Sequence, residues 1–329
     1  MEQIGWGVLA TGKIAHTFVN DLKLLPDARL VAAGSRSLAS AEAFVAEHGG
    51  TPYGSYAELV ADPAVDVVYV ASPHSLHDEH VRLAFDAGKA VLCEKPMTLD
   101  APSSEALIAL ARERGLFLME AMWMTCNPLV RRLRDLATGG DYGEVRQVVA
   151  DLGFRVDADP ASRMLDPALG ASTLLDMGIY PLTFAHLLLG QPSQTSAVAN
   201  LTDRGVDLDI AISLAYPSGA VAALTSSMTS WTARTATVAT DRGRFDVAAD
   251  FHTPVRITFT AYDGPDPQVE VIETPADDPV IGRGYGNEAA EVMRCLRAGE
   301  LESPFVPHAQ TLDLMRQMDG LRQQLGILG

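Results

Sequence analysis

The residues best placed to do chemistry lie in the stretch 91–97, Val-Leu-Cys-Glu-Lys-Pro-Met. Here an apolar, strand-like run ends in an acid and a lysine, Glu94 and Lys95, followed by Pro96, which has no backbone N–H to donate. Open α/β sheets bind their ligands at the carboxyl ends of the strands. A lysine at such an end can polarise a substrate oxygen or help a neighbouring hydroxyl to lose its proton. The alternative is a solvated Lys–Glu pair on a surface loop.

A glycine-containing turn near the N-terminus is the second candidate. Residues 7–15 read Gly-Val-Leu-Ala-Thr-Gly-Lys-Ile-Ala and stand between a strand pattern and a helical one. Gly12 lets the backbone approach a pyrophosphate, and the following helix offers free N–H groups and the positive end of its dipole. The predicted contacts are Ala10, Thr11, Gly12, Lys13 and Ile14. Because alanines replace two glycines of the G-x-G-x-x-G pattern, an ordinary strand-to-helix turn remains the alternative.

The end of the second strand pattern bears on the choice of cofactor. It reads Gly-Ser-Arg-Ser at 34–37, without the acid that would pair with the ribose 2′-hydroxyl of NAD. The Arg36 cation and the hydroxyls of Ser35 and Ser37 suit a 2′-phosphate, so the sequence predicts NADP, with NAD as the alternative cofactor and a solvated Arg36 as the alternative interpretation. The remaining predicted cofactor contacts follow the next two strand patterns: Ser72, Pro73, His74, His77, Glu94, Lys95 and Pro96.

Metal and disulfide chemistry are not predicted. His74, His77 and His80 are close in sequence, but no acid or thiolate completes a familiar zinc geometry. The three cysteines, Cys93, Cys126 and Cys295, are far apart and form no C-x-x-C spacing, which argues against a disulfide framework and a zinc site.

Length and charge limit the classes of protein and partner. The 329 residues predict two domains, 1–122 and 123–329. With 25 basic against 42 acidic residues and a net charge of −17, nucleic acid and anionic membranes are not expected partners. The N-terminus has no basic signal-peptide region, and no apolar run reaches the length of a membrane span, so a cytoplasmic location is expected.

The first domain alternates strand and helix patterns, which predicts a doubly wound parallel sheet. The expected strands are 4–10, 30–34, 67–71, 90–93 and 116–119, and the expected helices are 14–24, 38–47, 76–87 and 103–114. Ser103 or Ser104 is expected to cap the last helix at its start, and Gly115 at its end.

The second domain is expected to be α+β. Its helical patterns cover 129–137, 173–189, 287–298 and 309–324, and its strand patterns cover 145–152, 195–201, 208–216, 221–229, 235–240, 244–248, 255–259 and 269–273. Successive strands joined by short turns predict antiparallel hairpins in a sheet with one uncovered face. If that face is apolar, a dimer is the natural way to bury it.

Glu94-Lys95-Pro96 and the downstream Leu175-Asp176-Met177-Gly178-Ile179-Tyr180 together resemble motifs of the Gfo/Idh/MocA family, which includes glucose-fructose oxidoreductase and inositol 2-dehydrogenase. The chain is most similar to the branch of dimeric dihydrodiol dehydrogenase and NADP-linked D-xylose dehydrogenases. The resemblance implies a Rossmann domain followed by an α/β domain with a large open, mostly antiparallel sheet, commonly used for dimerisation. It also implies that Lys95 lies near the nicotinamide and the substrate hydroxyl. Asp176 and Tyr180 match the family's acid and its catalytic position, which is a tyrosine in that branch.

The chemistry of these residues is consistent with that resemblance. Asp176 and Tyr180 are four apart, so on a helix they share a face. Tyrosine has a pKa of about 10, and a nearby ammonium such as that of Lys95 favours the phenolate. A packing role for Tyr180 and a helix-terminal role for Asp176 remain alternatives. Where many relatives have Trp-Arg, this chain keeps only the arginine, Arg163, as a cofactor or substrate contact, so substrate identity stays open.

Together these features predict an NADP-dependent oxidoreductase that transfers a hydride between nicotinamide and a secondary alcohol or carbonyl of a sugar, polyol or cyclic diol. Lys95 and Tyr180 are its expected proton-transfer pair, with Asp176 beside them. The expected partners are a small polyhydroxylated substrate and a second copy of the chain, or more. The alternative function is an NADP(H)-binding sensor without turnover.

Overall fold

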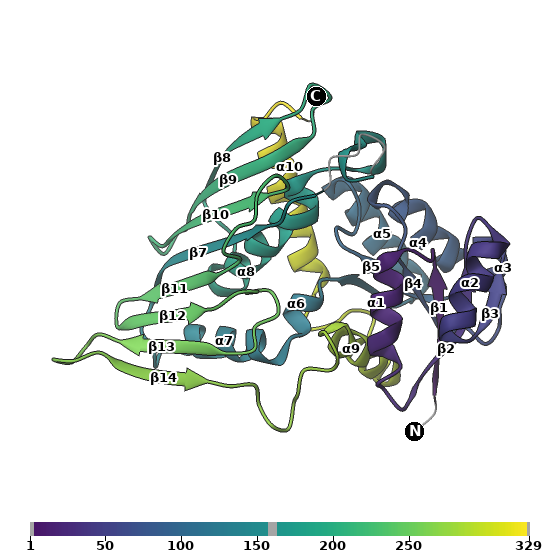
Figure 1. The fold of residues 1–329 in the computed structure, drawn as a ribbon, viewed down its shortest axis with the longest axis horizontal. Helices are drawn as coiled ribbons and strands as arrows, with labels where there is room; N and C mark the ends of the chain where they lie inside the picture. The colour runs from purple at the N-terminus through teal and green to yellow at the C-terminus, as the bar shows by residue number, and fades with distance from the viewer. Residues whose placement is uncertain (1–2, 157–162, 328–329) are drawn as a thin grey trace. The chain divides into compact units, whose positions relative to one another are not determined.

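The chain divides into two compact units that are not contiguous in sequence. The computed structural model describes residues 3–156 and 163–327. The first unit comprises Met1–Cys126 and Val280–Leu312, and the second comprises Asn127–Pro279 and Asp313–Gly329. The predicted boundary lay between 122 and 123 and assigned everything beyond it to one domain. The structure differs because the segment 280–312 returns to the first unit, where helix α9 (Tyr285–Ala298) packs against α1 (Lys13–Leu22) (Figure 1).

The first unit is built on a six-stranded parallel sheet in the order β3-β2-β1-β4-β5-β6. This order reverses direction at β1, which creates a crevice at the carboxyl ends of the strands. The strands are β1 (Ile4–Leu9), β2 (Ala28–Gly34), β3 (Thr51–Tyr53), β4 (Val67–Val70), β5 (Ala90–Glu94) and β6 (Leu118–Ala121). The doubly wound parallel sheet is thereby confirmed, and β3 is a strand that the sequence analysis did not predict.

The helices of this unit are α1, α2 (Leu38–His48), α3 (Tyr56–Ala61), the short 3₁₀ turn η1 (His74–Leu76), α4 (His77–Asp86), α5 (Ala101–Arg114), α6 (Trp123–Cys126) and α9. The four helices expected in the first domain are present, as α1, α2, α4 and α5, whereas α3 and α6 were not predicted. The predicted cap of α5 by Ser103 or Ser104 is wrong: Asp100 accepts the Ser103 N–H at 2.8 Å, because Pro102 sits in the first turn rather than before it. Gly115 ends α5 in the left-handed conformation, as predicted.

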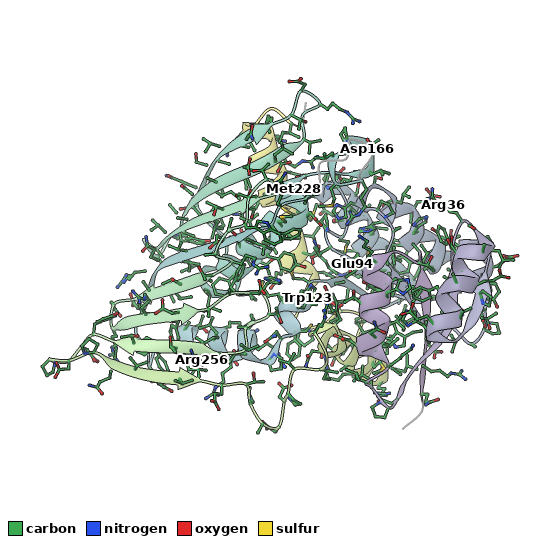
Figure 2. All side chains as sticks on the ribbon, viewed as in Figure 1. Arg36, Glu94, Trp123, Asp166, Met228 and Arg256 are labelled. Atoms are coloured by element: carbon green, nitrogen blue, oxygen red, sulfur yellow. The ribbon has the colours of Figure 1, made fainter. Side chains whose placement is uncertain are left out.

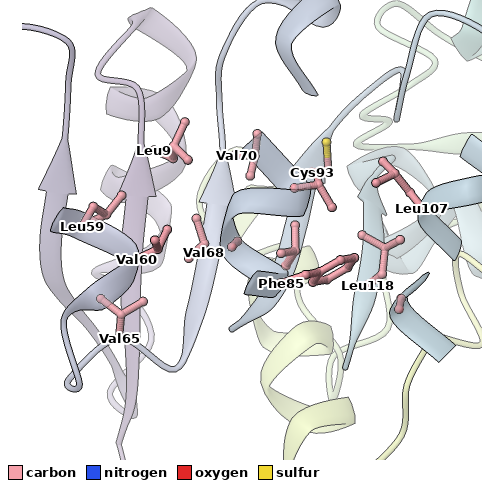
Figure 3. Packing of buried hydrophobic residues seen from close by; sticks show 14 of the residues in the cluster. Leu9, Leu59, Val60, Val65, Val68, Val70, Phe85, Cys93, Leu107 and Leu118 are labelled. Carbon is pink, nitrogen blue, oxygen red and sulfur yellow. The ribbon is translucent and has the colours of Figure 1, made fainter. Parts of the chain in front are cut away.

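The core of the first unit lies between this sheet and its helices. Val68 and Val70 of β4, Phe85 of α4 and Leu118 of β6 belong to one buried cluster (Figure 3). Strand β4 is buried at every position, as expected for a parallel strand covered on both faces. Such a core holds the strand ends, and the side chains that follow them, at defined positions.

The second unit contains an eight-stranded sheet in the order β14-β13-β12-β11-β7-β10-β9-β8 (Figure 1). Its strands are β7 (Val145–Gly153), β8 (Gln194–Leu201), β9 (Asp207–Ala215), β10 (Val221–Ser227), β11 (Ala236–Thr240), β12 (Gly243–Val247), β13 (Ile257–Ala261) and β14 (Gln268–Ile272). Among the described strands of this sheet only β7 and β10 pair in parallel, so the predicted large, mostly antiparallel sheet is confirmed.

Helices lie on one face of this sheet (Figure 1). The helical elements of the unit are α7 (Pro128–Thr138), the 3₁₀ turns η2 (Arg163–Leu165) and η3 (Pro167–Leu169), the π-helical turn η4 (Leu174–Gly178), α8 (Ile179–Leu189) and the part of α10 (His308–Gln324) from Asp313 onward. Helix α8 packs on β7 and β10. The stretch Pro167–Leu189 is apolar and long enough to pass a test for a membrane span, but 78% of its most apolar window is buried inside the structure, as in a core helix.

Candidate active site

The turn after β1 has the geometry of a phosphate-binding turn. Ala10 has a φ of 77°, the left-handed region, and its N–H donates to Gly34 O at 3.0 Å. Gly12 is the N-cap of α1, no side chain caps the helix there, and a Cβ at Gly12 would meet nothing within 4 Å. The predicted residues Thr11, Lys13 and Ile14 lie on this turn and on the first turn of α1, so the backbone N–H groups of the helix start are open to an anion.

A second group of side chains surrounds Arg36, just beyond the end of β2. Arg36 is exposed (Figure 2), and its positive charge contributes to lowering the pKa of His80, for which burial is the larger cause. The same charge partly offsets the burial that raises the pKa of Tyr56. The Tyr56 and His80 rings meet edge to face with centroids 4.7 Å apart. Ser35 and Ser37 flank Arg36, so a cation, hydroxyls and two rings gather at this strand end.

The segment after β4 is held by buried histidines. His77 is fully buried, with Nδ1 2.8 Å from Pro96 O and Nε2 2.9 Å from Ser72 O. Burial lowers the pKa of His77 to about 4, although both carbonyls favour the protonated ring. His77 therefore joins the ends of β4 and β5 from inside the protein, which is a different role from the predicted contact with cofactor. The neighbouring Pro73 and His74 begin the 3₁₀ turn η1, and His74 is buried.

Lys95 and Pro96 directly follow β5, and buried acids surround them. The Tyr69 hydroxyl donates a short hydrogen bond to Glu94, and Glu94 accepts the Lys95 N–H at 3.2 Å. Glu120, at the end of β6, accepts hydrogen bonds from Met97 N and Thr311 Oγ1, both at 2.9 Å. Burial raises the pKa of the Glu120 carboxyl, and the Lys95 charge opposes that rise. This frame fixes the backbone on both sides of Lys95.

Glu288 is a buried acid that was not among the predicted site residues. It lies in the first turn of α9 with no exposed surface, and neither carboxylate oxygen has a hydrogen-bond partner among the described residues. Burial and the charges of Glu94 and Asp21 raise its pKa well above the usual value. Glu288 also acts electrostatically on Tyr69, which stacks on Phe18 with centroids 3.9 Å apart. A neutral carboxylic acid is the form that this environment favours.

In the second unit, Asp176 and Tyr180 lie on consecutive helical elements. Asp176 is in the π-helical turn η4 and Tyr180 is in the first turn of α8. Asp207 of β9 accepts the Leu174 N–H at 2.7 Å, which ties the start of η4 to that strand. The Ser172 hydroxyl accepts the Leu175 N–H at 3.1 Å within the same turn. Tyr180 is largely buried, and its ring lies 5.3 Å from that of His252. Arg163 is exposed at the start of η2.

One cluster in the first unit has the composition of a metal site. The ligand atoms of His16, Glu47 and His48 lie within 4.8 Å of one another. However, His16 Nδ1 and His48 Nε2 are 2.8 Å apart, and Lys23 Nζ lies 3.0 Å from the other ring nitrogen of His48. Metal-bound histidines usually donate their second N–H to an acceptor, whereas here an ammonium donates to that nitrogen and repels a cation. The cluster is best described as a hydrogen-bonded chain.

Comparison with known proteins identifies the class. The oxidoreductase family with a NAD-binding Rossmann fold matches residues 4–122, and the GFO/IDH/MocA C-terminal domain matches residues 130–246. Trans-1,2-dihydrobenzene-1,2-diol dehydrogenase of Sus scrofa is 34% identical, with 98% of this chain and 97% of the relative covered. The NADP(+) D-xylose 1-dehydrogenase of Hypocrea jecorina is also 34% identical, with 98% and 92% covered.

A solved structure supports the same assignment. The 3-ketoreductase KijD10 of Actinomadura kijaniata, in complex with NADP and TDP-benzene, has a TM-score of 0.87 and 28% identity, with 98% of each chain covered.

The parallel sheet of the first unit and these matches define an oxidoreductase that uses a nicotinamide dinucleotide. The chain belongs to the Gfo/Idh/MocA family, which confirms the predicted family, enzyme class and kind of cofactor.

Proposed function

We propose that the chain is an NADP-dependent oxidoreductase that transfers a hydride between nicotinamide and a secondary alcohol or carbonyl of a sugar, polyol or cyclic diol. The observation that carries this proposal is that similarity to a diol dehydrogenase and a D-xylose dehydrogenase extends over 98% of the chain. The stretch covered contains the Glu94-Lys95-Pro96 run and the segment from Asp176 to Tyr180.

In this proposal, separate groups of residues bind the cofactor and transfer the proton. The backbone of Ala10 to Ile14 binds the pyrophosphate, and Arg36 with Ser35 and Ser37 binds the 2′-phosphate. Bound NADP supplies the hydride acceptor or donor at its nicotinamide ring. In the oxidative direction, Tyr180 takes the hydroxyl proton of the substrate, and the Lys95 ammonium favours the phenolate that does so. Asp176 orients the polar groups beside Tyr180, and Arg163 contacts the cofactor or the substrate.

The proton-transfer pair is tested by a double-mutant cycle. Tyr180→Phe and Lys95→Ala should each lower kcat with NADP⁺ by at least about a hundredfold, the usual size of a general acid–base contribution. Because the two groups act on one proton, the double variant should lose little more than either single variant. Affinity for NADPH, followed by fluorescence titration, should be nearly unchanged in Tyr180→Phe. Unchanged turnover in Tyr180→Phe would remove its assigned role.

The choice between NADP and NAD is tested at Arg36. Arg36→Ala should weaken NADPH binding by about tenfold or more, since a charge-assisted contact to phosphate is lost, and should leave NADH binding nearly unchanged. Equal weakening of both cofactors would contradict the 2′-phosphate assignment.

The sensor alternative makes a different prediction. A protein that binds NADPH without turning over any compound in a panel of pentoses, hexoses and cyclic diols, and whose NADPH binding is indifferent to Lys95→Ala, would be a sensor. We further propose a homodimer through the uncovered face of the eight-stranded sheet, and a cytoplasmic location.

A further inference from the structure

We propose that His252 binds the substrate hydroxyl next to the one that reacts, and so selects substrates with two adjacent hydroxyl groups. This inference rests on the proposed function, because it takes Tyr180 as the residue that exchanges the proton. The sequence offered no signal for His252, which stands alone in the segment between β12 and β13.

The position of His252 is set by its neighbour Phe251. Phe251 is fully buried and meets the Phe184 ring at 76° with centroids 5.4 Å apart. Phe184 follows Tyr180 by four residues on α8, so the two aromatic side chains share one helix face. Consecutive residues of the loop, Phe251 and His252, therefore pack along consecutive turns of α8, and the His252 ring lies beside the Tyr180 ring at 5.3 Å and 55°.

Backbone and charge contacts hold this loop against the next segment. Phe251 N–H donates to Arg234 O at 3.0 Å, and Thr253 N–H donates to Asp250 O at 2.8 Å. The Arg234 guanidinium lies 3.0 Å from the Asp250 carboxylate, so these two charged groups pair with each other. These contacts fix the backbone of the loop on both sides of His252.

The chemistry of a half-buried histidine fits a hydroxyl. A neutral imidazole offers one N–H donor and one acceptor, which match the acceptor and donor of an alcohol. The oxygens of two adjacent hydroxyls in a sugar or diol are about one hydrogen-bond length apart, roughly 3 Å. Two rings with centroids 5.3 Å apart can therefore serve neighbouring hydroxyls, Tyr180 the reacting one and His252 the next.

The test pairs a substrate with its analogue that lacks the neighbouring hydroxyl. D-xylose is compared with 2-deoxy-D-xylose, and trans-cyclohexane-1,2-diol with cyclohexanol, by kcat/KM with NADP⁺. The wild type should prefer the adjacent-hydroxyl compound of each pair that it turns over. His252→Phe keeps an aromatic ring beside Tyr180 and should reduce that preference by about three- to tenfold, the value of one hydrogen bond, mostly through KM. His252→Gln, which keeps a donor and an acceptor, should recover part of it.

His186→Gln is the matched control, because His186 is another partly buried histidine on α8 itself, and it should leave the preference unchanged. An unchanged preference in His252→Phe, with activity and thermal stability retained, would refute the role of His252 and leave the proposed function intact. The same holds if both compounds of a pair react equally well in the wild type. No turnover of any of the four compounds by the wild type, while NADPH still binds, would overturn the inference together with the proposed function.

Discussion

At the scale of single residues, Glu288 has an unfavourable environment for a negative charge. Its carboxyl is wholly buried, and its neighbours include the acids Glu94 and Asp21. An ionised carboxylate there lacks the hydrogen bonds and the counter-charge that stabilise buried ions. The raised pKa means that the folded protein binds a proton that the unfolded chain releases at neutral pH.

Replacing this acid by a neutral isostere should therefore stabilise the fold at neutral pH. The contribution of Glu288 is fully present below its unfolded pKa, near 4.5, and is lost as pH rises toward the folded value. Glu288→Gln should have the same Tm as the wild type near pH 4 and a progressively higher Tm than the wild type toward pH 8, because only the wild type must then keep or lose a proton at this buried site. Thermal melts across this pH range measure the difference.

The control is Glu291 on the same helix, whose pKa is lowered because Arg294 and Ser303 bond to it, against the effect of burial. Stability from such a group is present above its unfolded pKa and is lost as pH falls. Glu291→Gln should therefore destabilise at pH 7, with the loss shrinking toward acid. Parallel pH profiles for the two variants would contradict the assigned protonation states.

At the scale of secondary-structure elements, substitutions at two glycines should distinguish an effect on stability from an effect on cofactor binding. These are Gly5 in β1 and Gly12 at the N-cap of α1. A Cβ at Gly5 would lie 2.0 Å from Ala64 O, whereas a Cβ at Gly12 would enter open space. Both residues have backbone angles outside the left-handed region, so space alone distinguishes them.

Gly12→Ala should leave the Tm of the cofactor-free protein within about 1–2 °C, because at an N-cap the two residues differ by roughly a few tenths to 1 kcal/mol. It should weaken NADPH binding by about tenfold or more, since the added methyl group occupies the approach of the pyrophosphate. Gly5→Ala should lower the Tm instead. NADPH binding to Gly12→Ala with wild-type affinity would place the pyrophosphate elsewhere.

Local pattern predicted most of these elements, and the exceptions have physical causes. Strand β3 has three residues, one of them proline, and pairs only with the end of β2, so it carries no periodicity to detect. The return of 280–312 to the first unit depends on distant contacts, such as the Asp21 carboxylate accepting the N–H groups of Arg283 and Tyr285. Sequence spacing does not reveal such partners.

The candidate site was predictable where a motif marks it. Lys95, Gly12 and Tyr180 stand in recognisable runs, so sequence alone nominated them. Glu288 and His252 acquire their meaning only from residues far away in the chain, through burial in one case and a ring contact with Tyr180 in the other. The interior position of His77 likewise follows from packing, because its sequence context equally suits a surface contact.

At the scale of the whole molecule, the uncovered face of the eight-stranded sheet carries exposed apolar side chains. Val149 of β7, Val198 of β8 and Val221 of β10 are exposed on their strands, and their sheet neighbours include Ala211 and Ala223. Small and β-branched residues with few charges are typical of a buried contact rather than a solvated one.

The proposed homodimer predicts a mass of twice the chain in sedimentation at micromolar concentration. Val198→Lys together with Val149→Lys should shift it to the monomer, because two lysines would be buried without partners. Val255→Lys, at a valine that is 84% exposed and outside the strands, should have no effect. A wild-type monomer would contradict the proposed dimer.

The chain leaves the first unit after Cys126 and returns to it at Val280, which limits where the protein can be truncated. Strand β6 sits within the first unit, yet the Leu118 carbonyl depends on His308 and Glu120 depends on Thr311, nearly two hundred residues later. A protein ending at residue 126 would lack α9 and these partners, and would leave the Glu120 carboxylate and the surfaces of α1 and α6 that pack on α9 without cover. Expressed fragments of the N-terminal region should therefore aggregate or be proteolysed, and fusion partners or reporter insertions should be placed at the ends of the whole chain.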